Sequence, residues 1–349
     1  MADPIMRRLP AEWEEQDGVL VVWPHAESDW APCLSSVEPV FATLIREISR
    51  EETVLLVGPD PERSGLSLRT SGVAMSSVRI HEFPTNDTWA RDFGPLTVQD
   101  YDGSFLLDFD FNGWGFKFPA DLDNRITQRL HQEGAFGATR MKKVRIVLEG
   151  GSIESDGRGT ILTTAKCLLN SNRNPHLSRS DLEELLGMEF GCDRFLWLEH
   201  GYLAGDDTDS HVDTLARFCP DDTIIHVACD DPGDEHYGEL GVMRQELEAF
   251  RTREGRPYRL LELPWPAARY DEEGKRLPAT YANFLVINNA VLVPTYSDKH
   301  DDAALAVVGS AFPGRRIVGL NCLPLIAQHG SLHCVTMQIP KGVLPLCQA

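Results

Sequence analysis

The chain has 349 residues, 42% of them hydrophobic and 25% charged, a composition that is ordinary for a globular enzyme and excludes a disordered chain. Its 33 Lys and Arg residues against 53 Asp and Glu give a net charge of −20, which repels nucleic acid and anionic membrane surfaces and attracts small cations. The eight cysteines form no CxxC pair and no Cys/His grouping at zinc spacing, so neither a disulfide scaffold nor a zinc module is indicated.

The opening segment MADPIMRRLPAEWEEQ lacks the apolar core of a signal peptide. No apolar run reaches the roughly 18 residues of a membrane span. We therefore expect a cytoplasmic protein with unpaired thiols that binds neither nucleic acid nor a membrane. Length alone would suggest about two domains, although single barrels and propellers run longer.

Short apolar runs rich in β-branched residues alternate with amphipathic stretches along the whole chain, and this predicts an α/β fold. Helices are expected around residues 122–130, after a cap at Ser178, and over 240–250, from apolar residues at helical spacing. Strands are expected at 18–24, 53–58, 78–84, 94–100, 143–150, 159–164, 194–200, 223–228, 258–264, 283–294 and 333–340.

Each expected helix is accompanied along the chain by two or three expected strands. The segment FLVINNAVLVP (284–294) is typical of two paired strands joined by a turn, which argues against strict βαβ alternation. A doubly wound parallel sheet is therefore not favoured.

The segment AGDDTDSHVDTLARF (204–218) places several aspartates around one histidine. A calcium loop of the EF-hand type fails, because counting from Asp207 puts His211 at the fifth position and Val212 at the sixth, where glycine is needed. Other oxygen-rich metal sites stay open. If residues 211–215 are extended, His211 and Asp213 share one face, which would set an acid/base group beside an anion.

Three further stretches set polar residues into tight turns that carry glycine: NDTWARDFGP (86–95), LEGGSIESDGRGT (148–160) and GSLHCVTMQIP (330–340). Their candidate functional residues are Trp89, Asp92, Glu149 and Cys334. A structural interpretation stands beside each, because a carboxylate before a glycine-rich turn is often a cap and a cysteine in a strand is usually core.

Taken together, seven collinear motifs resemble the agmatine deiminases, in the family they share with bacterial peptidyl-arginine deiminases and within the guanidine-modifying superfamily. The resemblance implies a pentein fold, with five ββαβ-type units around a pseudo-fivefold axis, forming one catalytic domain over residues 1–349 with a central active site. The motifs are PAEWEEQDGVLVVWPH (10–25), WARDFGP (89–95), EGGSIESDG (149–157), CLLNSNRNP (167–175), DTDSHVDTLARF (207–218), YANFLVINNAVLVP (281–294) and HGSLHC (329–334).

The resemblance also implies residue roles. Cys334 falls on the family's nucleophile, His211 on its acid/base histidine, Glu149 on the glutamate paired with that histidine, and Asp92 and Asp213 on its guanidinium-binding carboxylates. Trp89 and Asn283 are expected as further substrate contacts. Asp206, Asp207 and Asp209 are expected to shape the turn or to add to the negative field.

The chemistry independently needs these residue types. A guanidinium is planar, cationic and forked, so two fixed carboxylates can bind and orient it. Its carbon is a poor electrophile, which suits a thiolate attacker, and the bound cation itself favours that thiolate. His211 then protonates the departing ammonia and activates a water. The expected reaction converts agmatine to N-carbamoylputrescine and ammonia, a step of putrescine synthesis, through a covalent amidino-cysteine, with no metal and no cofactor.

The sequence departs from the family pattern at three positions: Gln328 and His329 replace two glycines before GxxHC, and Ser210 replaces the glycine before HxD. How the amine end of the substrate is held therefore stays open. So do a peptidyl-arginine deiminase that produces citrulline, a Cys-His-Asp thiol hydrolase of amides, and a non-catalytic binding pentein, for which the loss of a core residue would be expected. Association into a homo-oligomer is also left open.

Overall fold

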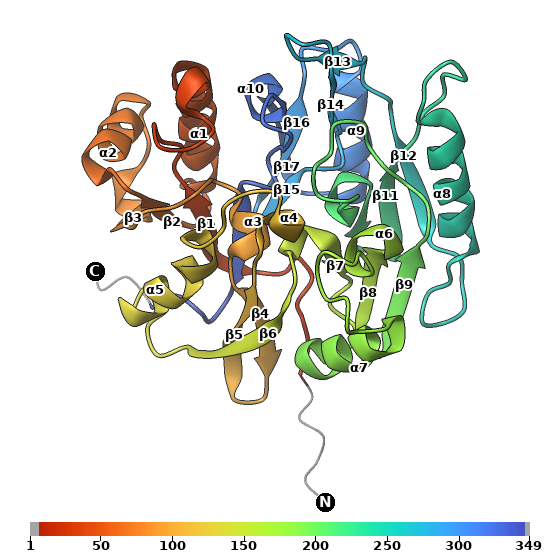
Figure 1. The fold of residues 1–349 in the computed structure, drawn as a ribbon, viewed down its shortest axis with the longest axis horizontal. Coiled ribbons are helices and arrows are strands. Elements are labelled where there is room, and N and C mark those ends of the chain that lie inside the picture. The colour runs from red at the N-terminus through yellow and green to blue at the C-terminus, as the bar shows by residue number, and fades with distance from the viewer. Residues whose placement is uncertain (1–6, 346–349) are drawn as a thin grey trace, which may run out of the picture.

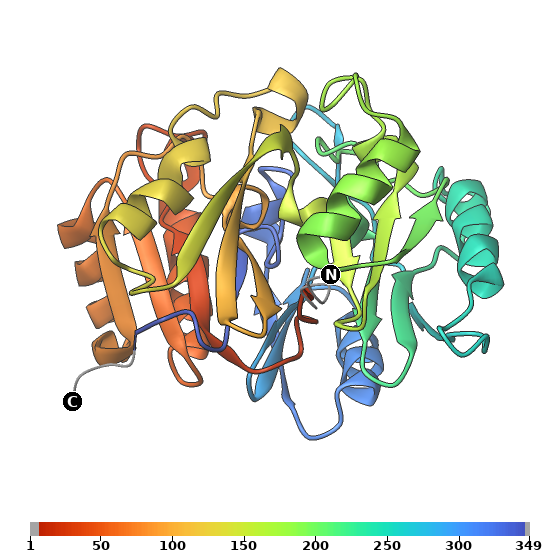
Figure 2. The ribbon, with the colours of Figure 1, turned by 90° about the horizontal axis from the view of Figure 1, so that it is seen from below.

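The computed structural model describes residues 7–345. Five small mixed sheets surround a central region, and the long helices lie on the periphery (Figures 1 and 2). In each sheet an antiparallel strand pair is extended by a strand that runs parallel to its second member. Since a parallel neighbour needs a long crossover, a helix precedes that strand in every unit.

Four units follow the same order of strand, strand, helix, strand. They are β4 (Leu96–Asp100), β5 (Gly103–Asp110), α5 (Ile126–Gln132) and β6 (Arg140–Val147); β7 (Ile153–Ser155), β8 (Thr160–Thr164), α7 (Arg179–Phe190) and β9 (Arg194–Leu198); β10 (Ala216–Cys219), β11 (Thr223–Val227), α8 (Tyr237–Ala249) and β12 (Arg259–Leu263); β15 (Leu285–Ile287), β16 (Ala290–Thr295), α9 (Asp301–Ala311) and β17 (Arg316–Asn321).

The remaining unit joins the two ends of the chain in one sheet. Strand β18 (Thr336–Pro340) pairs antiparallel with β1 (Gln16–Val22), and β2 (Thr53–Gly58) and β3 (Val78–Glu82) follow in parallel, linked by α1 (Leu34–Ile48) and α2 (Pro61–Thr70). This pairing closes the ring of units. The expectation of one catalytic domain over residues 1–349 stays a prediction, which the closure supports.

Short helical turns connect the units. Among them α3, η4 and η5 contact one another at the centre, so they bring three distant parts of the sequence together. The short elements are η1 (Ala31–Cys33), η2 (Met75–Ser77), α3 (Ala90–Phe93), α4 (Gly113–Phe116), η3 (Asp123–Arg125), η4 (Gly150–Ser152), α6 (Ala165–Leu168), η5 (Val212–Thr214), the hairpin β13 (Arg269–Tyr270) and β14 (Arg276–Leu277), and α10 (Leu323–Ile326).

Every expected strand segment overlaps an observed strand, and the predicted α/β fold with paired strands is confirmed. Ser178 caps α7 in a capping box with Asp181, as its position predicted. The pattern did not reveal α1, α2, α9, β5, β7, β10 or β17. Within residues 7–345, no helix is long and apolar enough to cross a bilayer.

One local expectation is wrong. Residues 211–215 are not extended, because Val212–Thr214 form a 3₁₀ turn that begins after His211. The turn is held by the backbone N–H of Thr214, which donates to the carbonyl of His211, and by the Thr214 hydroxyl, which donates to the same oxygen at 2.8 Å. His211 and Asp213 therefore reach the centre from a tight turn and not from one face of a strand.

Candidate active site

The central turns carry the predicted site residues to one buried place. Asp92 lies on α3, Glu149 directly precedes η4, and His211 and Asp213 belong to the η5 turn. Cys334 lies two residues before β18, and Asn283 two residues before β15. None of these six side chains belongs to a residue that is more than 6% exposed.

His211 stands between two carboxylates. Its Nδ1 lies 3.7 Å from Asp92 Oδ1, and its Nε2 lies 3.7 Å from Glu149 Oε2. Both ring nitrogens are buried without a hydrogen-bond partner. Burial opposes protonation, but Asp92, Cys167 and Glu149 outweigh it and raise the pKa of His211 well above its usual value. This environment favours the imidazolium, the form that can donate a proton to a leaving group.

Glu149 is oriented from behind by Arg173, which the sequence analysis did not single out. The Arg173 Nε donates to the two carboxylate oxygens at 3.0 and 3.3 Å, and both side chains are fully buried. Although burial works against it, hydrogen bonds and charges from His211 and Arg173 lower the pKa of Glu149. The only sequence signal was the motif CLLNSNRNP, which contains Arg173.

Asp92 accepts a hydrogen bond from the backbone N–H of Gly151 at 3.0 Å and another from Trp114 Nε1 at 2.9 Å. Burial, with smaller effects of Asp213 and Glu149, raises its pKa to about 6. The short distance to Gly151 is informative. A Cβ on this glycine would lie 2.6 Å from His211 Nδ1 and 3.0 Å from one oxygen each of Asp92 and Asp213, so the glycine keeps the space between these groups open.

Cys334 has a buried thiol beside a carboxylate and an amide. Its Sγ lies 4.0 Å from Asp213 Oδ2 and 3.4 Å from Asn283 Oδ1. Burial, followed by the charges of Asp213 and Asp92, raises the pKa of this thiol well above its usual value. In the absence of a cation the side chain is therefore a neutral thiol, and a positive charge placed near it would favour the thiolate.

Asn283 holds the loop of the thiol. Its Oδ1 accepts the backbone N–H groups of His333 at 2.9 Å and Cys334 at 3.3 Å. Its Nδ2 is buried and has no partner, so this amide nitrogen is the atom that could serve the predicted substrate contact.

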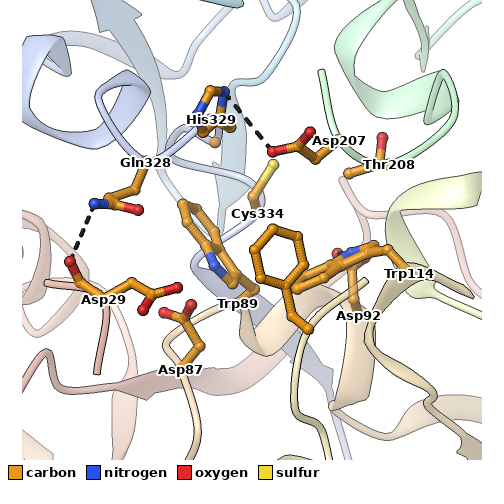
Figure 3. Close-up of a pocket in the computed structure, with 12 residues that line it drawn as sticks. Asp29, Asp87, Trp89, Asp92, Trp114, Asp207, Thr208, Gln328, His329 and Cys334 are labelled. Carbon is orange, nitrogen blue, oxygen red and sulfur yellow. Dashed lines mark hydrogen bonds and ion pairs between the residues drawn. The ribbon is translucent and has the colours of Figure 1, made fainter. Parts of the chain in front are cut away.

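A cavity of about 170 Å³ opens above Cys334. Figure 3 shows Trp89 and Trp114 on opposite sides of it, with Cys334 and Asp92 reaching into it. Only Trp89, Asp92 and Cys334 were predicted from the sequence. The other lining residues are Asp29, Asp87, Trp114, Phe118, Asp207, Thr208, Gln328, His329 and Gly330.

The three departures from the family pattern lie around this cavity. Ser210 and His329 have φ angles of +69° and +67°, a left-handed conformation that glycine adopts most easily. The His329 side chain compensates, because its Nδ1 lies 2.7 Å from the carbonyl oxygen of Gly205. Gln328 donates to the backbone carbonyl of Asp29 at 3.1 Å. These side chains tie the cavity's loops together where two glycines would leave a gap.

The aspartates of the 204–213 loop divide into three roles. Asp206 accepts the backbone N–H groups of Thr208 and Ser210 at 3.0 and 2.7 Å, which shapes the turn as expected. Asp209 pairs with Lys117 at 2.9 Å and with Arg173. Asp207 lines the cavity, so attributing it to the turn or the general field alone was incomplete.

Two clusters in the described residues have the donor atoms of a metal site: Glu149, Cys167 and His211, and Glu12, Glu154 and His333. An arginine already neutralises each of them. Arg173 pairs with Glu149, and Arg217 pairs with Glu12 at 2.9 Å and with Glu154. A metal ion would have to compete with these buried guanidinium groups, so neither cluster is a good cation site.

The fold and this buried set of one thiol, one imidazolium and three carboxylates define a guanidine-modifying hydrolase of the pentein class. The family model of the Porphyromonas-type peptidyl-arginine deiminases matches residues 8–340, and the chain belongs to this family.

Relatives carry different substrate names. A Shewanella baltica protein, provisionally named agmatine deiminase, is 32% identical over 96% of this chain and 94% of its own length. A Porphyromonas gingivalis structure provisionally named arginine deiminase is 48% identical, with a TM-score of 0.91 over 97% of this chain and all of its own. A cysteine-to-serine variant of the C. jejuni agmatine deiminase with substrate bound is 40% identical, with a TM-score of 0.90 over 97% of each chain.

Proposed function

We propose that this protein hydrolyses agmatine to N-carbamoylputrescine and ammonia, a reaction of putrescine synthesis. The observation that carries the proposal is the charge of the cavity. Four aspartates (29, 87, 92 and 207) line it, and its lining within the described residues holds no lysine and no arginine. Agmatine has a cation at each end of a four-carbon chain, so a cavity with carboxylates near the thiol and further out suits both ends.

In the proposed mechanism Asp92 and Asp213 bind the guanidinium and place its carbon next to Cys334 Sγ. As the cation binds, the Cys334 thiol loses its proton to solvent, and the resulting thiolate attacks the carbon and forms a C–S bond. The C–N bond to one terminal nitrogen then breaks, that nitrogen takes a proton from the His211 imidazolium, and ammonia leaves. His211, now neutral, removes a proton from water. The resulting hydroxide attacks the same carbon and the C–S bond breaks. The added hydroxyl group then gives its proton to solvent, and the ureido product and the Cys334 thiolate are released.

The aliphatic chain and the amine end are assigned to the outer cavity. Trp89, Trp114 and Phe118 supply apolar and cation-attracting walls for the methylenes and the ammonium. Asp29, Asp87 and Asp207 supply the negative charge. Burial raises the pKa of Asp87 to about 6, so this carboxylate is ionised at neutral pH but sensitive to acid.

Other substrates fit less well. Free arginine adds a carboxylate that no lysine or arginine in the lining described above would compensate. A peptide needs an open cleft, whereas Gln328 and His329 tie the loops of this cavity together. A thiol hydrolase that acts on amides would not need the second carboxylate, Asp92. A non-catalytic pentein would not need to keep the complete set of five core residues.

The test is a ureido-product assay with agmatine, free arginine and a blocked arginine peptide at two ionic strengths. A misplaced like charge in a poorly solvated site costs a few kcal/mol, and each ~1.4 kcal/mol is tenfold, so kcat/KM for agmatine should exceed that for arginine by roughly a hundredfold or more. Salt should reduce capture of the dication, because charges are screened beyond about 10 Å at 0.1 M. A clear preference for the peptide would make the protein a peptidyl-arginine deiminase instead.

A further inference from the structure

A buried chain of charged groups lies behind Asp213, and the proposed mechanism does not use it. His333, the residue before the thiol, has its Nδ1 2.7 Å from Asp213 Oδ2 and its Nε2 2.6 Å from Glu12 Oε2. His333 is 1% exposed and Glu12 is 9% exposed. Arg217 donates to the same Glu12 oxygen at 2.9 Å. The chain therefore connects a carboxylate of the active site, through one imidazole, to a carboxylate near the N-terminus.

The imidazole is held on every side. The backbone N–H of His333 donates to Asn283 Oδ1 at 2.9 Å, and its carbonyl oxygen accepts Arg91 Nε at 3.3 Å. Nδ1 faces the Asp213 carboxylate and donates to Oδ2, whereas Nε2 faces both Glu12 Oε2 and the Arg217 guanidinium, whose Nη2 lies 3.0 Å away. The ring is thereby fixed in both position and orientation.

Fixing the ring also fixes Asp213. Its Oδ2 is occupied by His333, whereas its Oδ1 is buried without any partner. A buried carboxylate oxygen is costly unless something pairs with it. Oδ1 is therefore the acceptor that remains for a guanidinium N–H.

We propose that His333, oriented by Glu12, is a positioning residue that keeps Asp213 ionised and turned toward the guanidinium. This inference rests on the proposed deiminase function, but it concerns recognition of the guanidinium and not the identity of the substrate's other end. Burial opposes ionisation of Asp213, and the hydrogen bond and charge of His333 are the largest effects that nevertheless lower its pKa.

The other charges near Asp213 do not replace His333. His211 and Arg217 also lower the pKa of Asp213, but His211 is shared with Asp92 and Glu149 and Arg217 with Glu12 and Glu154. The Cys334 thiol and Asp92 supply no positive charge, and Arg91 lies 3.8 Å from Glu12. His333 is the side chain that donates directly to Asp213.

Two substitutions separate positioning from mere packing. In His333→Asn the amide NH₂ lies near the place of Nδ1 and can still donate to Asp213. In His333→Gln the amide reaches the place of Nε2 and faces Glu12 instead. The asparagine variant therefore keeps a donor to Asp213, whereas the glutamine variant loses it.

The matched controls are His236→Asn and His236→Gln. His236 is equally buried, and its Nδ1 lies 2.6 Å from Asp234 Oδ1 while its Nε2 accepts the backbone N–H of Ala204 at 2.8 Å. His236 does not line the cavity above Cys334, and it is not one of the predicted site residues. The loss of thermal stability in these controls measures what removal of a buried, carboxylate-bound histidine costs by itself.

The affinity for guanidinium ion and for agmatine is titrated in the Cys334→Ser background from about pH 5 to 9. KM, kcat and Tm are measured with Cys334 present, on the guanidine that the wild type turns over fastest. We expect His333→Gln to weaken binding and raise KM by about tenfold more than His333→Asn, the size of one charge-assisted hydrogen bond. The acid limb of binding should move to higher pH in His333→Gln, because the pKa of Asp213 rises when its hydrogen-bond donor is removed. Control variants should lose Tm only.

Equal losses of affinity in the two His333 variants, or an acid limb that does not move, would overturn the proposal and leave His333 a packing residue. If both variants fail to fold, Glu12→Gln provides the same test, because it removes the carboxylate that orients the His333 ring but keeps the ring, and its acid limb should move in the same direction. Failure of the proposed function looks different: the wild type would release no ureido product from any guanidine, while the titrations would still decide the role of His333.

Discussion

The guanidinium of Arg173 and the carboxylate of Glu149 form an ion pair in which neither side chain is exposed. The pair stands behind His211, whose Nε2 lies 3.7 Å from Glu149. We expect Arg173→Met to leave the buried Glu149 carboxylate with only the more distant His211 as a partner, and breaking a buried ion pair in this way costs roughly 3–5 kcal/mol of stability. The variant should also lose about a hundredfold in kcat, because His211 loses the fixed anion that orients it.

The matched control for this prediction is Arg158→Met. Arg158 pairs with Asp222, but about half of its side chain is exposed, so loss of this pair should cost no more than about 1 kcal/mol and leave kcat unchanged. Urea denaturation and steady-state kinetics of the two variants provide the measurement. If Arg173→Met kept the stability and kcat of the wild type, Arg173 would have no part in the site.

The pH dependence of substrate capture should follow Asp92, whose pKa burial raises to about 6. A carboxyl group is neutral below its pKa and ionised above it, so the attraction for a guanidinium is lost as the pH falls through about 6. We expect kcat/KM to fall about tenfold per pH unit below that point. An acid limb near pH 4, the ordinary range of an aspartic acid, would show that Asp92 is not the group that binds the cation.

Trp114→Phe refines this test without removing the carboxylate. Trp114 Nε1 donates to Asp92 Oδ2 at 2.9 Å, and this hydrogen bond favours the ionised form. Its removal should move the acid limb of kcat/KM to higher pH while the packing of an aromatic side chain is largely kept. If the acid limb of kcat/KM does not move, Asp92 is not the group whose titration produces it.

The sequence predicted the core of the site better than its surroundings. Cys334, His211, Glu149, Asp92, Asp213, Asn283 and Trp89 could be named because each lies in a motif with a known family pattern, and the structure brings them to one centre. Arg173, Trp114 and Phe118 were missed because no local pattern distinguishes a buried arginine or a cavity wall from core. Asp29 and Asp87 reach the cavity from loops of the unit that contains β1, β2 and β3. Their position beside the rest of the cavity depends on closure of the ring of units and not on spacing along the sequence.

Some strands and helices of the fold could likewise be predicted from the sequence, and others could not. Apolar runs of four or more residues, such as those of β1 and β2, indicate buried strands, and these strands were predicted. Strand β7 has only three residues, and β17 carries exposed arginine and asparagine at its ends, so neither gives a clear period-two signal. Helix α1 contains Pro39, which obscures its periodicity.

Gly151 offers a test of where the guanidinium binds. A methyl group at this position would come within 3.0 Å of His211, Asp92 and Asp213, so Gly151→Ala should fill the space between the two carboxylates and reduce kcat/KM by about a hundredfold or more. Gly238→Ala is the control. It lies in α8 with no atom within 4 Å of the added methyl, and alanine there should stabilise the helix by about 0.5–1 kcal/mol with unchanged kinetics. If Gly151→Ala keeps the kinetics of the wild type, the guanidinium of the substrate does not bind beside this turn.

We expect Cys334, and not the buried thiols of Cys322 and Cys167, to be the nucleophile. Cys334→Ser should lose all measurable turnover yet still bind agmatine, because a hydroxyl ionises far less easily than a thiol while the carboxylates that bind the cation stay in place. Cys322→Ala is the control, since burial raises the pKa of Cys322 to about 12 and this residue does not line the cavity. Rapid acid quenching of the wild type during turnover, followed by peptide mass spectrometry, should place the amidino adduct on the peptide that contains Cys334. Its appearance on Cys322 or Cys167, or a Cys334→Ser enzyme that keeps a tenth of the wild-type rate, would remove Cys334 from the nucleophile role.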